Sequence, residues 1–397
     1  MAAVDDVLGI YTMIPDSRIG SGAQGWIERA TRDGVMYAVK FSKGYISSIN
    51  EYFTTREFDG HPHIIQAYSL YPKIVRVSPF TKKEETVTAM VMEYANHGDL
   101  FKYAAKGVFG CPKLTAKVRD VKLTESYARI LFSELVKAVE TCHTKRICHL
   151  DIKLENLLLK DWSLKLADFG LSRKCDDSGH IEKITGATYS YSPPEFFIRN
   201  LDGTYKIDPK GARVMNEDGT YDAYIINSDD TYTYDGTKVD IFNMGIVLFI
   251  LLTGFPPLDN ALYPGDWYYT RILKGDFESF WNGIEKTVWI SPSAKRLLTG
   301  MLWPLYEERY TIDDIKASEW FKTENAKDTE EKEDARSSLI KKLESTELDP
   351  VNLKSQFDAV AGQGRKSKRH LCRRKGKKRS CRRKGKKHLC IPKLVRH

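Results

Sequence analysis

The sequence lacks a long uninterrupted hydrophobic run. Its most apolar stretch, 241–255, is interrupted by Asn243 and Gly245 and stops at Pro256-Pro257. A membrane-spanning helix needs about 20 predominantly apolar residues, so we expect this stretch to be a buried helix of a soluble protein with no membrane contact. The amino terminus has acidic residues where a signal peptide would have basic ones, and it has no apolar segment.

Cysteine is scarce. The chain has 7 cysteines, and three of them follow residue 370 at nine-residue spacing. Neither this spacing nor the scatter of the others fits a disulfide framework or a zinc site. We therefore expect a reducing compartment, cytoplasmic and/or nuclear.

Acidic residues are absent from the last part of the chain. Residues 361–397 contain 17 Lys or Arg and no Asp or Glu, whereas the preceding 360 residues hold 45 basic and all 53 acidic residues. The body is therefore acidic and the tail strongly basic. We expect 365–397 to be disordered, because its charges repel one another. Such a tail suits a nuclear import receptor or nucleic acid as its partner.

The segment from His149 to Gly170 holds a set of polar residues suited to phosphoryl transfer. Asp151 and Lys153 lie in a polar turn, Asn156 follows, and Asp168-Phe169-Gly170 comes after two short apolar runs. Phosphoryl transfer needs a carboxylate near the attacking hydroxyl, and an amide plus a second carboxylate to hold magnesium on the phosphates. Either half alone is weak evidence, but chance poorly explains both at this separation.

A glycine-rich turn near the amino terminus is followed by a strand that ends in lysine. Residues 19–27 contain Gly20, Gly22 and Gly25, and Tyr37-Ala38-Val39-Lys40 closes the next strand. Glycines at this spacing let the backbone approach phosphate oxygens, although a flexible hairpin tip has the same pattern. No helical pattern follows the turn, which argues against a dinucleotide-binding fold.

These segments, in this order, resemble the eukaryotic protein kinase family of the Ser/Thr type. The resemblance covers about 11–321. Sequences at 155–159 and 311–315 are most similar to the calcium/calmodulin-dependent and energy-sensing kinase group. The family implies an α+β bilobal fold, with a β-rich N-lobe that carries one main helix and a larger α-helical C-lobe. It also implies ATP and Mg²⁺ as cofactors, and transfer of the γ-phosphate to Ser or Thr of proteins.

The resemblance gives each matched polar residue a role. Asp151 would orient the substrate hydroxyl and accept its proton, and Lys153 would steady the transferring phosphoryl group. Thr188 would contact both of them. Asn156 and Asp168 would bind magnesium.

The resemblance also implies a nucleotide site between the lobes. Lys40 would hold the phosphates while it pairs with a helix glutamate, and Met92, Glu93 and Ala95 would line the adenine slot. The residues assigned to this site or to its rim are Ile19, Gly20, Ser21, Gly22, Gly25, Ile27, Ala38, Lys40, Glu51, Met92, Glu93, Ala95, Asp99 and Glu155.

Three of these assignments keep an alternative open. Glu51 is favoured as the partner of Lys40, but Glu57 is a rival, and Ser48 to Glu51 also fits a helix capping box. Asp99 would face the ribose and the substrate, or else would be the acid at a helix amino terminus. By family resemblance, Asp99 and Glu155 would together select substrates with basic residues upstream of the target.

The segment 171–195 resembles the kinase activation segment. Thr185 within it is a candidate phosphorylation site, and Leu150 replaces the family arginine that would bind the phosphate. Arg309 would pair with Glu195, by resemblance.

Domain boundaries follow from the same alignment of motifs. We expect an N-terminal extension over 1–10, an N-lobe over 11–95, a C-lobe over 96–321 with an insertion at 199–235, a charged linker over 322–364, and the basic tail. A helix capped at Thr124 should precede the central segment. Within the linker, 338–343 could form a short amphipathic helix, although a solvated linker is the commoner case.

Two alternatives to an active kinase remain. One is a pseudokinase scaffold, suggested by Leu150 and the long insertion. The other is a nucleic-acid-associated protein that acts through its tail. A complete set of Lys40, Asp151, Asn156 and Asp168 favours an active enzyme, and we expect it to be a monomer.

Overall fold

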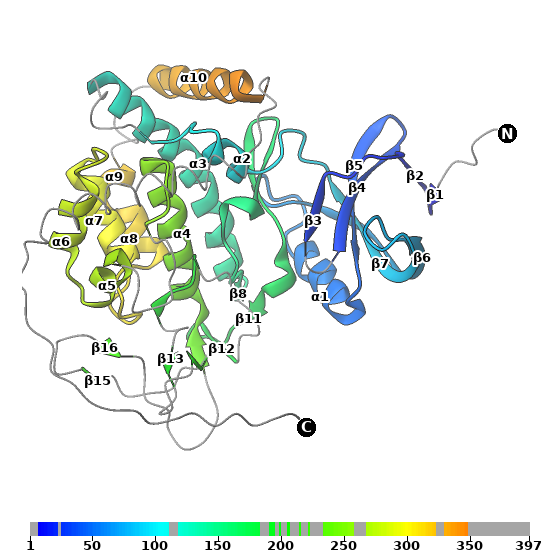
Figure 1. The fold of residues 1–397 in the computed structure, drawn as a ribbon, viewed down its shortest axis with the longest axis horizontal. Coiled ribbons are helices and arrows are strands. Elements are labelled where there is room, and N and C mark those ends of the chain that lie inside the picture. The colour runs from blue at the N-terminus through cyan, green and yellow to red at the C-terminus, as the bar shows by residue number, and fades with distance from the viewer. Residues whose placement is uncertain are drawn as a thin grey trace, which may run out of the picture.

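The computed structural model describes most of the kinase-like region and one helix beyond it. The described residues are 7–22, 25–110, 118–182, 190–194, 198–199, 205–206, 214–215, 221–222, 233–257, 267–322 and 329–347. They form a sheet-rich lobe and a helical lobe (Figure 1). The expected bilobal α+β fold is confirmed.

The smaller lobe is an antiparallel sheet with one helix beside it. The sheet order is β1-β2-β4-β5-β7-β6, and β3 pairs with β4 outside this path. Its first strand already lies within 1–10, so the sheet begins before the expected boundary. The strands are β1 (Val7–Leu8), β2 (Tyr11–Met13), β3 (Gly20–Gly22), β4 (Gly25–Arg32), β5 (Val35–Ser42), β6 (Ala67–Val77) and β7 (Glu84–Glu93).

Helix α1 (Tyr45–Arg56) packs beside this sheet and begins one turn earlier than the sequence pattern predicts. Its N-cap is Gly44, and the Ser48 hydroxyl donates to the Gly44 carbonyl at 2.7 Å. The capping box at Ser48 to Glu51 is therefore wrong, because both residues lie inside the helix. Glu51 is buried and is free to point toward the interlobe cleft.

The larger lobe is built around a helix that is apolar on all sides. Helix α4 (Gly236–Thr253) begins at the N-cap Asp235, whose carboxylate accepts from the Thr237 and Lys238 amides, and ends at Gly254 with φ 80°. Among the described residues it is the one helix long and apolar enough to span a membrane, but 89% of it is buried inside the protein. It is the central core helix of this lobe, as the sequence predicted.

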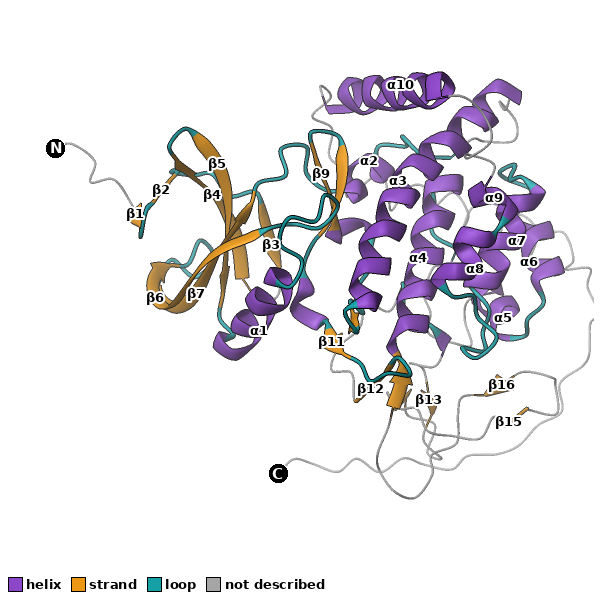
Figure 2. Cartoon of the chain, turned by 180° about the vertical axis from the view of Figure 1, so that it is seen from behind, coloured by secondary structure: helices purple, strands orange, loops and turns teal. Residues whose placement is uncertain are grey.

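The other helices surround α4 (Figure 2). Helix α3 begins six residues before the expected cap at Thr124, because no proline or glycine interrupts the preceding residues. The helices are α2 (Leu100–Ala105), α3 (Val118–Thr144), α5 (Trp267–Leu273), α6 (Phe277–Ile284), α7 (Pro292–Met301), α8 (Ile312–Ala317) and α9 (Glu319–Lys322).

Short antiparallel strand pairs lie within the segment from His149 to Gly170 and beside it. The hairpin of β9 (Leu157–Lys160) and β10 (Ser163–Leu166) lies between Asn156 and Asp168. Strand β8 (Ile147–Cys148) pairs with β11 (Arg173–Lys174), and β12 (His180–Glu182) pairs with β17 (Thr233–Asp235). In the insertion and just before it, the described strands are β13 (Ile198–Arg199), β14 (Tyr205–Lys206), β15 (Val214–Met215) and β16 (Tyr221–Asp222).

The region expected to be a charged linker contains a long docked helix. Helix α10 (Thr329–Glu347) lies along α3 on the side of the C-lobe that faces away from the insertion strands (Figure 1). Leu339 and Leu343 are buried in the main core cluster. The solvated-linker alternative is wrong over this helix, and the amphipathic-helix alternative for 338–343 describes it, because these two leucines make an apolar contact that a solvated segment would not make.

Candidate active site

The cleft between the lobes holds a lysine bound to two carboxylates. Lys40 on β5 places its Nζ 2.6 Å from Glu51 Oε1 and 3.0 Å from Asp168 Oδ1. Glu51 comes from α1, and Asp168 follows β10, so the three residues connect the sheet, the helix and the C-lobe. Glu57 instead lies 4.0 Å from Lys174 and is 47% exposed.

Burial and charge oppose each other at this cluster. Burial alone would lower the pKa of Lys40, but the Glu51 and Asp168 carboxylates outweigh it and raise that pKa. Burial raises the pKa of Glu51 to about 7, against the opposing charge of Lys40. Burial would also raise the pKa of Asp168, but Lys40 holds it below its usual value. The cleft therefore keeps Asp168 ionised and places its carboxylate, 44% exposed, toward the open side.

The backbone at Asp168 is held in a left-handed conformation. Its φ is 65°, and its Oδ1 accepts from the Gly170 amide at 3.3 Å. The following Phe169 is buried, stacks on Phe58 with ring centroids 5.1 Å apart, and meets His149 edge-on at 4.8 Å. Such strain persists at functional sites when the surrounding packing fixes it, and here the phenylalanine provides that packing.

A second polar group lies at the start of the β9–β10 hairpin. Lys153 Nζ donates to Asp151 Oδ2 at 2.7 Å, and the Asn156 amide nitrogen donates to the same oxygen at 3.0 Å. Asn156 also donates to the Asp151 carbonyl at 2.8 Å. These contacts fix the Asn156 side chain so that its nitrogen faces Asp151, which leaves its carbonyl oxygen as the ligand-type atom.

A buried aspartate on α4 fixes the turn that precedes Asp151. Asp240 accepts from the His149 and Leu150 amides at 2.8 and 2.7 Å, and His143 Nε2 lies 2.9 Å from it. Asp240 is fully buried, and Leu150 has φ 65°. These bonds show how Asp240 holds the strained turn in place.

A small apolar cluster lies beside the charged cluster, where the two lobes meet. Ile65, Ala95 and Ala167 are buried there, with Met92 and Leu158 packed against them. Ala38 is the register partner of Met92 across β5 and β7. The cluster thus combines residues of both lobes and of the segment that connects them, and its apolar composition is that expected beside a flat aromatic ring.

The glycine-rich hairpin covers the same strands. Gly20 pairs with Ile27, Ser21 with Trp26, and Gly22 with Gly25. A Cβ at Gly25 would meet the Phe41 carbonyl oxygen at 1.7 Å. Gly25 is therefore required by the close approach of β5, whatever it does for a ligand.

Comparison with known proteins identifies the family to which this region belongs. Residues 14–209 match the family model described as the protein kinase domain. The chain carries a protein kinase domain. CBL-interacting serine/threonine-protein kinase 10 of Arabidopsis thaliana is 32% identical over 70% of this chain and 45% of its own length. Kinase 2 of the same group and organism is 33% identical over 66% of this chain and 44% of its own.

A third relative aligns over more of the sequence. CBL-interacting serine/threonine-protein kinase 19 of Arabidopsis thaliana is 29% identical over 80% of this chain and 54% of its own length. The chain thus spans about half the length of the curated relatives it matches.

Two carboxylates at the edge of the kinase cleft have environments that favour a cationic neighbour. Asp99 is the N-cap of α2, and its carboxylate accepts from the Lys102 amide at 2.9 Å. This contact is the one expected if Asp99 is the acid at a helix amino terminus. Burial raises the pKa of Asp99. Burial and the charges of Asp99 and Asp151 also raise the pKa of Glu155, against Lys153. Glu155 is therefore close enough to both Asp99 and Asp151 to be repelled by each of them.

Several assigned residues fall outside the described part of the chain. These include Thr188 and Thr185 of the activation segment, and Glu195, the expected partner of Arg309. Arg309 itself is buried, donates to the Trp303 and Lys238 carbonyls at 2.9 and 2.8 Å, and lies over the Phe242 ring.

The side chain of Glu93 has a role that sequence reasoning missed. The family resemblance placed Glu93 at the adenine slot, but its buried carboxylate binds Lys160 at 2.7 Å and Lys165 at 3.1 Å. These lysines lie on β9 and β10, so Glu93 ties the connecting segment to the hairpin. No local sequence pattern joins Glu93 to these lysines, because they lie on different elements far apart in the chain.

The residues present fit ATP with magnesium. Asp168 and Asn156 offer a carboxylate and an amide oxygen, the hard ligands that Mg²⁺ takes together with substrate phosphates and water. Lys40 lies beside Asp168, where it would meet phosphate oxygens. Bound magnesium would neutralise the charge that develops on the phosphates.

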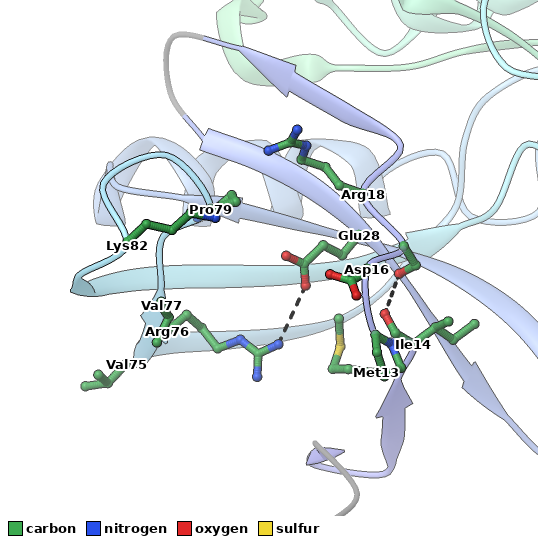
Figure 3. Close-up of a pocket in the computed structure, with 12 residues that line it drawn as sticks. Met13, Ile14, Asp16, Arg18, Glu28, Val75, Arg76, Val77, Pro79 and Lys82 are labelled. Carbon is green, nitrogen blue, oxygen red and sulfur yellow. Dashed lines mark hydrogen bonds and ion pairs between the residues drawn. The ribbon is translucent and has the colours of Figure 1, made fainter. Parts of the chain in front are cut away.

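A separate cavity of about 630 Å³ lies at the outer part of the N-lobe (Figure 3). Arg18, Arg76 and Lys82 lie around it with Glu28, which forms an ion pair with Arg76 at 3.7 Å. Its lining includes none of the residues described above at the interlobe cleft.

Proposed function

We propose that this chain transfers the γ-phosphate of ATP to Ser or Thr hydroxyls of protein substrates. The observation that carries the proposal is the joint geometry of Lys40, Glu51 and Asp168 beside the Asp151 group. In this mechanism Lys40 binds phosphate oxygens, Asp151 orients the hydroxyl and takes its proton, and Lys153 meets the transferring group. A scaffold without activity would not need this complete set of charges, so the pseudokinase alternative is disfavoured.

The direct test is magnesium-dependent transfer from ATP to a basic protein substrate. Asp168→Ala should abolish transfer, since one preorganised charge at a developing charge is worth about 3 kcal/mol or more of barrier. Asp313→Ala is the matched control, because this carboxylate lies in the first turn of α8, away from the cleft. Near wild-type turnover in Asp168→Ala would end the kinase proposal.

We further propose that substrates carry Arg or Lys two or three residues before the target. The support is the pair Asp99 and Glu155: burial raises the pKa of both, and the charge of Asp99 adds to the rise at Glu155. A basic side chain bound there would relieve their mutual repulsion. Glu155→Gln should raise KM for a peptide with upstream arginine and leave KM unchanged for its alanine counterpart; equal effects on both peptides would contradict this preference.

The basic tail supplies a sequence of this kind. Lys377-Lys378-Arg379-Ser380 places basic residues before a serine, and a tethered segment reaches an effective concentration of about millimolar when its connection is short and flexible. We propose that the tail competes with substrates or is itself phosphorylated. An import receptor or nucleic acid is the alternative partner. Truncation after residue 360 should lower the apparent KM for a basic peptide at low salt; no change, with no phosphate on Ser380, leaves only the alternative.

The relatives are named for interaction with CBL proteins. Because the chain spans about half of their length, a partner of this type is a proposal to be tested by binding. We also propose a cytoplasmic and/or nuclear location.

A further inference from the structure

One buried carboxylate, that of Glu134, links helix α10 to strand β10, which precedes Asp168. Glu134 on α3 accepts from the Leu164 amide of β10 through Oε2 at 2.8 Å. Its other oxygen, Oε1, accepts from Arg336 of α10 at 2.8 Å. Glu134 is only 7% exposed, and Arg336 is 38% exposed. Arg336 therefore neutralises a buried charge that holds β10 in place, and removing it would leave that charge without this partner.

The turn of the same hairpin is strained and held from several sides. Asp161 and Trp162, which join β9 to β10, have φ 48° and 63°. Asn96 bonds Asp161 through both ends of its amide, at 2.9 and 3.0 Å. His97 stacks on Trp162 with ring centroids 3.6 Å apart. A bulky residue at positive φ is costly and persists only where its surroundings fix it.

The hairpin connects the two magnesium-type ligands. Asn156 immediately precedes β9, and Asp168 follows β10 by two residues. The Ala167 amide donates to the Asn156 carbonyl at 2.9 Å, which closes the hairpin beneath both side chains. On the other side of β10, the Leu164 carbonyl lies 3.2 Å from His63 Nδ1. A shift of β10 would therefore move Asp168 relative to Asn156.

The docking of α10 is specific along its length. Leu339 and Leu343 enter the core, the Ser338 hydroxyl lies 2.7 Å from the Tyr127 hydroxyl, and Lys106 Nζ donates to the Thr346 carbonyl at 2.7 Å. These contacts join α10 to both α2 and α3 and fix where Arg336 lies. The helix lies outside the residues matched by the kinase family model.

We infer that α10 supports the active geometry, with Arg336 and Glu134 as positioning residues for the β9–β10 hairpin. Docked α10 keeps Leu164, and through it Asp168, in register with Asn156. Displacement of α10 loosens the hairpin and weakens magnesium-dependent nucleotide binding. The consequence for catalysis rests on the proposed function, but the effect on the hairpin does not.

Amide hydrogen exchange in the full chain tests the inference without turnover. Arg336→Ala should make exchange across 157–166 about tenfold faster, since a charge-assisted hydrogen bond is worth about that factor or more. Arg336→Lys should restore part of the protection, because a lysine retains the cation opposite Glu134. Lys341→Ala is the matched control, since this residue is exposed on the same helix and should leave exchange unchanged.

An activity measurement adds a readout that a purely structural role would not move. Arg336→Ala should raise the Mg²⁺ concentration for half-maximal rate several-fold and leave KM for the peptide unchanged. Unchanged exchange across 157–166 overturns the inference. So does uniformly faster exchange through the whole C-lobe, which would mean general destabilisation. An inactive wild type with the predicted exchange pattern would count against the proposed function alone.

Discussion

Two junctions hold the catalytic parts of this kinase domain in place, and they use opposite chemistry. At the cleft, Lys40 lies between Glu51 and Asp168, so the junction of α1 with the C-lobe is made of charges. At the start of the activation segment, Leu150 packs against Ile181 of β12 and Val239 of α4, so that junction is apolar. The charged junction responds to protonation and to charged ligands. The side chains of the apolar junction offer no hydrogen-bond donor to a phosphate.

The charged junction should show the largest effect of a single substitution. Lys40→Met removes the only partner that Glu51 and Asp168 share in the described contacts, and it removes a cation facing the phosphates. We expect a rate loss of about 100-fold or more, from a barrier increase of about 3 kcal/mol. Steady-state transfer measures it, with thermal unfolding to verify folding. Lys83→Met, at an exposed residue of the β6–β7 turn, is the control; equal losses in both variants would remove the special role of Lys40.

The apolar junction should show its effect in stability. Leu150→Ala removes a side chain that is 3% exposed and packed beside Cys148 and Ile181. We expect the free energy of unfolding to fall by about 2–3 kcal/mol, the usual cost of truncating a buried leucine. Denaturant unfolding measures this change. Val75→Ala is the control at 59% exposure and should cost about 0.5 kcal/mol or less. A similar small cost for Leu150→Ala would show that the junction is not held by this packing.

Lowering the pH should weaken the charged junction, which contains titratable groups, and not the apolar one. Burial raises the pKa of Glu51 to about 7, so Glu51 is ionised above that pH and neutral below it. Neutral Glu51 no longer offsets the positive charge of Lys40. We therefore expect kcat/KM for ATP to fall as the pH drops through about 7, with a slope that approaches tenfold per pH unit. Glu51→Gln should lose this acid limb.

The control for the pH profile is Glu57→Gln, at an exposed residue that follows the same helix. It should keep the wild-type profile. An unchanged acid limb in Glu51→Gln would assign the titration to another group.

Most of the cleft could be predicted from sequence because its residues recur at fixed separations. Lys40, Asp151, Asn156 and Asp168 each follow a strand or a turn with its own local pattern, and the structure places Lys40 and Asp168 in contact. The choice between Glu51 and Glu57 could not be made as surely. It depends on where α1 begins, and that start is at Tyr45 after a glycine with no side-chain cap.

Contacts between distant segments were beyond the sequence. Nothing local in Arg336 predicts that it meets Glu134, because the two residues are 202 positions apart and the helix that carries Arg336 is charged on most of its surface. The two lysine partners of Glu93 were missed for the same reason. In each case a buried glutamate forms an ion pair with a lysine or arginine from another element, and such pairing depends on tertiary packing.

The smallest expected effect is at Thr185 of the activation segment. In related kinases an arginine before the catalytic aspartate would bind a phosphate there, but this position is Leu150, which is buried in an apolar cluster. The segment is instead tied at β12 by pairing with β17 and by Ile181. We therefore expect Thr185→Ala to reduce kcat/KM by less than tenfold, under about 1.4 kcal/mol, as should Ser178→Ala in the exposed turn before β12. Assays with and without phosphatase treatment measure both variants. A loss of tenfold or more in Thr185→Ala, reproduced by phosphatase treatment of the wild type, would show that a phosphate stabilises this segment and that the apolar junction is not sufficient.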